Sequence, residues 1–221
     1  MSSNNYNHRF DCWYKDVCNK ESCDGCIRFL EMSYLMEASD IPITKQVPIS
    51  LKPDDIDYER FVRLSEIKND IVNFVTEGEN LYLSSQHTGN GKTSWAIKLM
   101  LKYFDSIWAG NGLRARGMFV HVPTLIMRLK NFESPVPEEY KNYLLNLDLI
   151  IWDDIGHSEI SKYDYSNLLM LIDNRLLSEK SNIFTSNLTR KSELDKLLGV
   201  KISSRIWNTS TRIELEGEDK R

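Results

Sequence analysis

Hydrophobic residues along this chain follow two spacings that alternate through most of the sequence. Short apolar runs bounded by polar or glycine-rich segments predict strands at 81–83, 117–122, 147–154 and 182–187. Apolar residues at helical spacing predict helices at 27–38, 58–75, 95–104, 123–132 and 163–177. Strands that alternate with helices favour an α/β domain, with a largely parallel sheet flanked by helices.

The chain divides near a proline-rich stretch. Pro42, Pro48 and Pro53 break regular structure between the first predicted helix and the alternating region. With 221 residues, the chain is long enough for one well-buried domain and a small appendage. We therefore predict an N-terminal module with its linker at 1–50 and a main domain at 51–221.

Composition narrows the class of protein. Hydrophobic residues make up 41% of the chain, but no apolar run approaches the ~18 residues that a membrane span needs. The first residues contain no apolar leader, so we expect a cytoplasmic protein without membrane contact. A net charge of -4 argues against a nucleic-acid coat protein, so any contact with DNA must be local or shared among subunits.

A glycine-rich loop follows the first predicted strand of the main domain. The loop ends in Gly91, Lys92 and Thr93, which match the Gly-Lys-Ser/Thr ending of a phosphate-binding loop. Gln86 stands where that pattern has its first glycine. The backbone can still curl around a phosphate, Lys92 can reach the terminal phosphates, and Thr93 can offer its hydroxyl to Mg²⁺. The residues predicted to bind nucleotide here are His87, Thr88, Gly89, Asn90, Gly91, Lys92, Thr93 and Ser94. The alternative is a polar surface turn.

Two later strands also end in polar residues. Asp153 and Asp154 follow a buried run, so Asp153 is predicted to hold Mg²⁺ and Asp154 to polarise the attacking water. Asn187, at the next strand end, can orient that water or sense the terminal phosphate. The alternatives are solvated charge at a strand exit and an ordinary turn asparagine.

Two cations near the C-terminus can act on a neighbouring subunit. Lys201 and Arg205 lie one helical turn apart, and either can present its charge to the nucleotide of an adjacent copy. The alternative for each is a solvated helix face.

All four cysteines cluster near the N-terminus. Cys23 and Cys26 form a C-x-x-C knuckle, and Cys12 and Cys18 can complete a tetrahedral set for structural zinc, with His8 as a substitute ligand. Zinc would supply folding energy to a module too small to bury a core. Free thiols are the alternative, and a disulfide suits a cytoplasmic protein poorly.

Together these features resemble the AAA+ ATPases of the DnaC/DnaI helicase-loader group, with IstB-type transposition ATPases as close relatives. The segments that carry the resemblance are GNGKTS at 89–94, IIWDDIG at 150–156, FTSNL at 184–188 and SRI at 204–206. The resemblance places Lys92 and Thr93 in Walker A, Asp153 and Asp154 in Walker B, and Asn187 at sensor 1. It assigns Arg205 to the arginine-finger region and implies a P-loop core without a C-terminal lid.

The resemblance implies an ATPase that binds ATP or ADP with Mg²⁺. It further implies a replicative hexameric DNA helicase as the partner of the N-terminal module, single-stranded DNA as a ligand, and self-association upon assembly. The resemblance is to loaders of bacterial cells, those encoded by phages in particular, and it leaves host and phage origin as alternatives. The leading hypothesis is therefore an ATP-dependent helicase loader; the alternatives are an IstB-like DNA-targeting ATPase, a small-molecule phosphotransferase and an ATP-binding adaptor without useful turnover.

Overall fold

We describe the protein from a computed structural model. It describes residues 12, 14, 17–19, 23–46, 51–53, 55–129, 137–157 and 162–217. His8 lies outside these residues, so its proposed role as a zinc ligand stays a prediction.

The centre of the molecule is a sheet of five parallel strands. They are β1 (Asn80–Ser84), β2 (Gly117–His121), β3 (Leu149–Asp153), β4 (Ser181–Ser186) and β5 (Ser210–Glu214). Their order across the sheet is β2-β3-β4-β1-β5, and each pair is parallel. The predicted parallel sheet is confirmed, with β5 as an additional edge strand.

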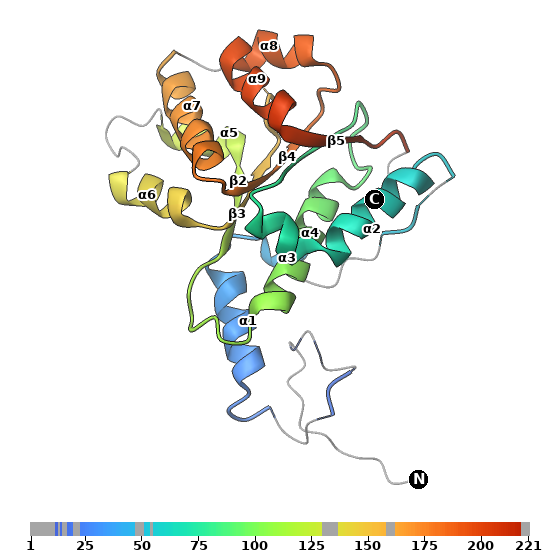
Figure 1. Cartoon of the computed structure of the whole chain (residues 1–221), viewed down its shortest axis with the longest axis vertical. Helices are drawn as coiled ribbons and strands as arrows, with labels where there is room; N and C mark the ends of the chain where they lie inside the picture. The colour runs from blue at the N-terminus through green and yellow to red at the C-terminus, as the bar shows by residue number, and fades with distance from the viewer. Residues whose placement is uncertain are drawn as a thin grey trace.

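Helices cover both faces of the sheet (Figure 1). On one face lie α1 (Ile27–Glu37), α2 (Tyr58–Asn69), α3 (Ile71–Thr76) and α4 (Lys92–Ile107). On the other face lie α5 (Val122–Leu129), α6 (Glu138–Asn146), α7 (Lys162–Leu177), α8 (Lys191–Leu198) and α9 (Val200–Thr209). A short 3₁₀ turn, η1 (Ile43–Lys45), follows α1. No helix in the described ranges is both long and apolar enough to cross a bilayer.

The strands divide their side chains between two hydrophobic cores. Leu83 and Ile151 point into the core beneath α4, whereas Tyr82 and Trp152 point into the core beneath α7 and α9. Because side chains alternate along a strand, a run that is apolar at every position can be buried on both faces. The apolar runs in the sequence encode this three-layer arrangement.

A buried arginine fastens the amino ends of β3 and β4. Arg175 of α7 is inaccessible to solvent and donates to the Asn182 side chain and to the carbonyl groups of Leu144, Leu147 and Ser181. Burial lowers the pKa of Arg175 to about 9, so the guanidinium is still charged at neutral pH. Arg175 thereby holds the amino ends of β3 and β4 together. The opposite ends of these two strands carry the predicted acidic and polar residues.

The structure differs from the expected helix at 58–75. That segment forms α2 and α3, which meet at Asp70, whose backbone leaves the helical region at φ -107° and ψ 24°. The Asp70 carboxylate accepts a hydrogen bond of 2.7 Å from the Asn73 side chain, a local contact typical of helix ends. Apolar spacing alone did not reveal the break, because Ile71 and Phe74 continue the buried face after it.

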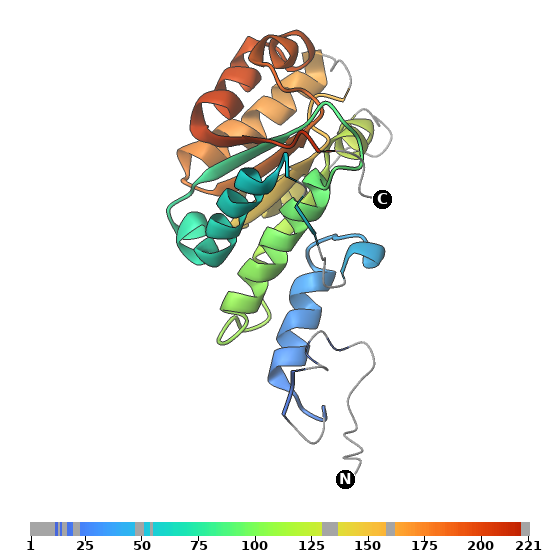
Figure 2. The same cartoon turned by 90° about the vertical axis from the view of Figure 1, so that its right-hand side faces the viewer.

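The first helix packs on the sheet-containing part of the molecule. Met32 and Leu35 of α1 are buried in the same core as α4. Glu31 accepts backbone hydrogen bonds from Gly112 (3.2 Å) and Leu113 (3.0 Å), between α4 and β2. Figure 2 shows α1 extending beyond the sheet beside the far end of α4, where Arg28 donates to Asp105. The predicted division into 1–50 and 51–221 stays a prediction about folding units.

Candidate active site

The carboxyl ends of the parallel strands meet at one edge of the sheet. Strand pairing places Ser84 of β1 opposite Ser186 of β4, and His121 of β2 opposite Asp153 of β3. Since all strands run in the same direction, the loops after β1, β3 and β4 leave from this edge. The polar strand ends therefore converge, as the sequence predicted.

Two glycines shape the loop between β1 and α4. Gly89 and Gly91 have φ values of 77° and 102°, in a backbone region that residues with a Cβ rarely adopt. Gly91 is the N-cap of α4, which begins at Lys92 rather than at the predicted Trp95. The first amide groups of α4 thus border the loop, and the positive end of the helix dipole favours phosphate there.

The side chain of Asn90 supports this loop from beneath. It is buried, and its amide nitrogen donates to the Ser85 hydroxyl and to the Leu215 carbonyl, the latter over 3.1 Å. These bonds connect the loop to the end of β1 and to the residue after β5. Asn90 therefore fixes the loop's shape in addition to lining the predicted nucleotide site.

The loop lysine is already directed into the loop. Lys92 is buried, and its ammonium donates to the His87 carbonyl over 3.0 Å and to the Asn90 side chain over 3.4 Å. An ammonium held by neutral acceptors can exchange them for phosphate oxygens, which are stronger acceptors because they carry charge. Lys92 is thus placed to bind the terminal phosphates.

The two predicted magnesium ligands lie side by side. The hydroxyl groups of Thr93 and Thr185 both donate to the same carboxylate oxygen of Asp153, over 2.8 and 2.7 Å. Burial raises the pKa of Asp153 above its usual value, against the lowering effect of these two hydrogen bonds. A hydroxyl and a carboxylate beside a phosphate site form an all-oxygen donor set that fits Mg²⁺. Thr185 was missed from the sequence, although it lies in the polar end of its strand.

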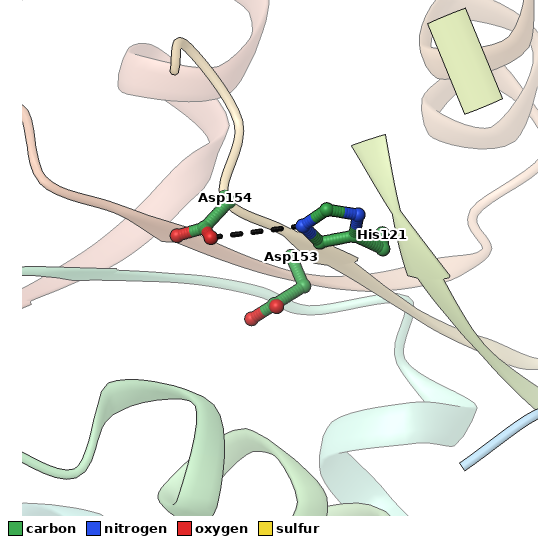
Figure 3. Close-up of side chains that lie close together, drawn as sticks. All are labelled: His121, Asp153 and Asp154. Carbon is green, nitrogen blue, oxygen red and sulfur yellow. Dashed lines mark ion pairs between the residues drawn. The ribbon is translucent and has the colours of Figure 1, made fainter. Parts of the chain in front are cut away.

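The second acidic residue faces a histidine that the sequence analysis did not assign. Asp154 has a left-handed backbone (φ 57°), and its amide donates to the Thr185 hydroxyl. Its carboxylate lies 3.8 Å from Nε2 of His121, whose Nδ1 is 2.8 Å from the Thr124 hydroxyl. Figure 3 shows the Asp154 carboxylate directed toward the ring of His121, whereas that of Asp153 points away from it. One ligand atom from each of the three residues lies within 4.8 Å of the others. His121 is therefore placed to position Asp154.

A cavity of about 400 Å³ lies over the loop. Its wall includes residues 88–94, together with Asp154 and Asn187. His87 is absent from the wall and contributes its carbonyl group to Lys92 instead. Lys45 and His157 also line the cavity, and neither was assigned from the sequence. Most of the predicted nucleotide residues thus surround one space.

The predicted trans-acting cations lie outside this cavity. Lys201 and Arg205 are exposed on α9, and neither lines the cavity. Arg205 forms an ion pair with Asp173 of α7, and this hydrogen bond raises the pKa of Arg205 above its ordinary value. A role for either residue requires the nucleotide of another subunit.

The four cysteines surround a separate cavity of about 490 Å³. All four are free thiols, and Arg28 and Trp108 also line this space. Four thiols are a suitable donor set for zinc, and zinc–sulfur distances of about 2.3 Å would bring tetrahedral sulfurs to about 3.8 Å from one another. Within the described residues, no three of these sulfur atoms all lie within 4.8 Å of one another. The cysteines are gathered but are not in zinc-binding geometry, so the zinc site stays a prediction.

Three solved structures have a fold similar to that of this chain. The DnaC helicase loader has a TM-score of 0.61 at 20% identity, covering 75% of this chain and 93% of that chain. DnaI has a TM-score of 0.63 at 20% identity, covering 83% and 95%. A putative primosome component from Streptococcus pyogenes serotype M3 has a TM-score of 0.60 at 22% identity, covering 86% and 98%. At these identities the likeness establishes the fold.

The sequence itself matches one family of ATP-binding proteins. The match covers residues 31–221 and is to the family described as IstB-like ATP binding protein. No curated protein matches the sequence. The matched region contains the phosphate loop, the paired aspartates and all five strands. The chain therefore belongs to the IstB-like ATP-binding family and is an ATPase with the P-loop AAA+ fold.

Proposed function

We propose that this ATPase loads a replicative hexameric DNA helicase during the initiation of DNA replication. The observation that carries the proposal is the correspondence in fold with the DnaC helicase loader and DnaI over 93% and 95% of their chains. The phosphate loop and its acidic partner strand supply the ATP-dependent switch that such a loader requires. ATP binding favours one state of the helicase complex, and hydrolysis releases it.

Hydrolysis follows from the placement of five residues. Lys92 would bind the terminal phosphates, and Thr93 and Asp153 would hold Mg²⁺, whose charge would offset that of the phosphate oxygens. Asp154 polarises the attacking water, and Asn187, across the cavity wall, orients it. The Asp153 carboxylate needs no new support, since Thr185 retains its hydrogen bond when Thr93 turns toward the metal.

A neighbouring copy completes this site. We assign the trans-acting cation to the exposed pair Lys201 and Arg205 on α9. Arg205 is paired with Asp173 within its own chain, so its action in trans requires exchange of that carboxylate for phosphate. Any contact with single-stranded DNA would be shared among the assembled subunits, because the net charge of -4 argues against strong binding by one chain.

The N-terminal module supplies the helicase contact in this proposal. Zinc bound by Cys12, Cys18, Cys23 and Cys26 draws the four thiols together and supplies folding energy to the N-terminal module. The cysteines already border one cavity, which supports this assignment.

Co-elution with a hexameric replicative helicase tests the proposal. Wild-type protein is mixed with helicase and either ATP or ADP, and compared with a variant carrying Cys23→Ser and Cys26→Ser and with Lys92→Ala. We expect an ATP-dependent complex that Lys92→Ala loses, and zinc and helicase binding that are lost together in the cysteine variant. Failure of the wild-type protein to bind any tested helicase would overturn the proposal.

The same samples separate the alternatives. An IstB-like DNA-targeting ATPase would assemble on double-stranded DNA with ATP and without helicase. An adaptor without useful turnover would load helicase equally well after Asp154→Asn, whereas the loader is expected to stall in its ATP-bound state.

A further inference from the structure

The described segment that follows α1 reaches the phosphate-binding cavity at Lys45. It is held at its start because Ile41 is buried and its carbonyl accepts a hydrogen bond of 2.8 Å from the Gln46 side chain. The turn itself is closed by the Lys45 amide, which donates to the Pro42 carbonyl over 2.7 Å. This part of the linker is therefore a hydrogen-bonded turn, where the sequence predicted only irregular structure.

The same segment contacts the phosphate loop on its other side. A Cβ built on Gly91 would lie 3.5 Å from the Leu51 side chain, which is ordinary van der Waals contact. Leu51 also packs against the core beneath α4. Residues on either side of the segment, at 41 and at 51, are thus anchored to the body that carries the loop.

Between these anchors, Lys45 projects into the nucleotide cavity. Its side chain lines the same space as Lys92, Asp154 and Asn187. It is exposed, and in the part of the chain that the structure describes it has no hydrogen bond or ion pair. The ammonium is therefore not neutralised by a carboxylate of the protein.

Charge in the cavity explains what this ammonium binds. ATP with one Mg²⁺ retains about two negative charges, and Lys92 offsets one of them. Asp154, in the same wall, adds a carboxylate rather than a cation. The ammonium of Lys45 can therefore offset the negative phosphate charge that Lys92 leaves.

We propose that Lys45 is a nucleotide-binding residue that contacts the phosphates of bound ATP from the linker. Lys92 lies within the α/β layers at the start of α4, whereas Lys45 lies in the turn that follows α1. Nucleotide binding then fixes the 43–46 turn and, through it, the connection to the N-terminal module. The proposal requires only that the chain binds ATP, and it stands whether or not the protein loads a helicase.

Nucleotide affinity tests the contact. Dissociation constants for fluorescent ATP and ADP analogues are measured for wild type, Lys45→Ala, Lys45→Arg and Lys196→Ala. Lys196 is an exposed lysine on α8 outside the cavity. Its replacement by alanine removes the same positive charge without touching the cavity. We expect Lys45→Ala to weaken binding about fivefold to twentyfold, Lys45→Arg to restore most of it, and Lys196→Ala to have no effect.

Two further measurements distinguish loss of the Lys45–phosphate contact from a loss of folding. Thermal unfolding without nucleotide should be the same for wild type and Lys45→Ala, because the side chain is exposed. Hydrogen exchange at 43–46 should slow with ATP in wild type and stay unchanged in Lys45→Ala. Equal affinities for wild type and Lys45→Ala, or an equal loss in Lys196→Ala, would overturn the proposal.

Discussion

The two ends of α4 present contrasting sites. At its amino end, Lys92 and Thr93 are held by the loop and by the strand that carries Asp153. At its other end, about 24 Å away for 16 residues, Asp105 receives hydrogen bonds from Tyr14 (2.6 Å) and Arg28 (2.7 Å) of the N-terminal segment. The nucleotide site is therefore built at the strand ends, whereas the cysteine-lined cavity lies where the N-terminal segment packs against the end of α4.

The contrast extends to how far each site is organised in advance. The Asp153 carboxylate already has two hydroxyl donors, so binding Mg²⁺ needs little rearrangement. The four cysteines share one cavity without converging, so zinc must draw them together. A site assembled from strand ends is positioned by backbone pairing, whereas a cysteine cluster in a small module is positioned mainly by its metal.

The largest effect is expected at the amino end of α4. Lys92→Ala removes the buried ammonium that binds the terminal phosphates and should reduce ATP turnover at least about 100-fold. Steady-state phosphate release measures the loss, and circular dichroism checks that the fold is retained. Turnover within a factor of about three of wild type would show that the loop does not act as assigned.

A slightly smaller effect is expected when only the chemical step is removed. Asp154→Asn keeps the side chain's size but removes the charge that polarises water, so the rate constant should fall about 100-fold with ATP affinity unchanged. Binding and single-turnover hydrolysis are measured separately. Equal losses in Asp153→Asn and Asp154→Asn, both through nucleotide affinity, would contradict the division of roles between the two aspartates.

Replacement of His121 tests whether this residue positions Asp154. His121→Ala removes a positioning contact and should lower the hydrolysis rate about threefold to tenfold, with ATP affinity unchanged. His121→Asn retains a hydrogen-bond donor and should restore part of the rate. A loss of affinity rather than rate would mean that His121 supports the loop instead.

The contacts at the carboxyl end of α4 are expected to affect stability and leave hydrolysis intact. Asp105→Asn weakens charge-assisted hydrogen bonds and should reduce the free energy of unfolding by about 1–3 kcal/mol. Asp195→Asn, which alters a pair with Lys191 one turn away in α8, is the matched control and should cost less, because that pair joins two residues of one helix rather than two separate segments. Urea denaturation measures both variants, and turnover per folded molecule should not change.

The difference in unfolding free energy between wild type and Asp105→Asn is expected to depend on pH. Burial opposes ionisation of Asp105, but hydrogen bonds from Tyr14, Arg28 and Lys102 outweigh it and lower its pKa. A carboxylate with a lowered pKa stabilises the fold above its ordinary pKa, and this contribution is lost as the pH falls through the folded value. The stability gap between wild type and Asp105→Asn should therefore stay nearly constant from pH 7 to about pH 5 and shrink as the pH falls below the ordinary pKa of 3.8; a gap that stays constant below that pH would contradict the assignment.

The sequence predicted the parts of this molecule that depend on local pattern. Buried runs such as 149–153 identified the parallel strands, and the Gly91-Lys92-Thr93 ending identified the phosphate loop before either had a position in space. Asp153 and Asn187 followed because parallel strands end at a common edge. These inferences needed only the order of elements.

What the sequence did not reveal depends on contacts between distant segments. His121 ends a strand as an ordinary polar residue, and only the pairing of β2 with β3 brings it to Asp154. Lys45 lies in a proline-rich linker, and only the path of that linker carries it to the phosphate loop. The edge strand β5 has mostly exposed or half-exposed residues, so its hydrophobic pattern was too weak to predict it.

Delivery of a hexameric helicase onto closed single-stranded DNA circles tests the proposed function most directly. Helicase that remains on DNA after a salt wash is measured with wild-type protein, Lys92→Ala or no added protein, each with ATP. The account predicts that wild-type protein increases the retained helicase at least about tenfold over both other samples. Equal retention in all three, alongside ATP-dependent assembly of the protein on DNA alone, would contradict helicase loading and favour the DNA-targeting alternative.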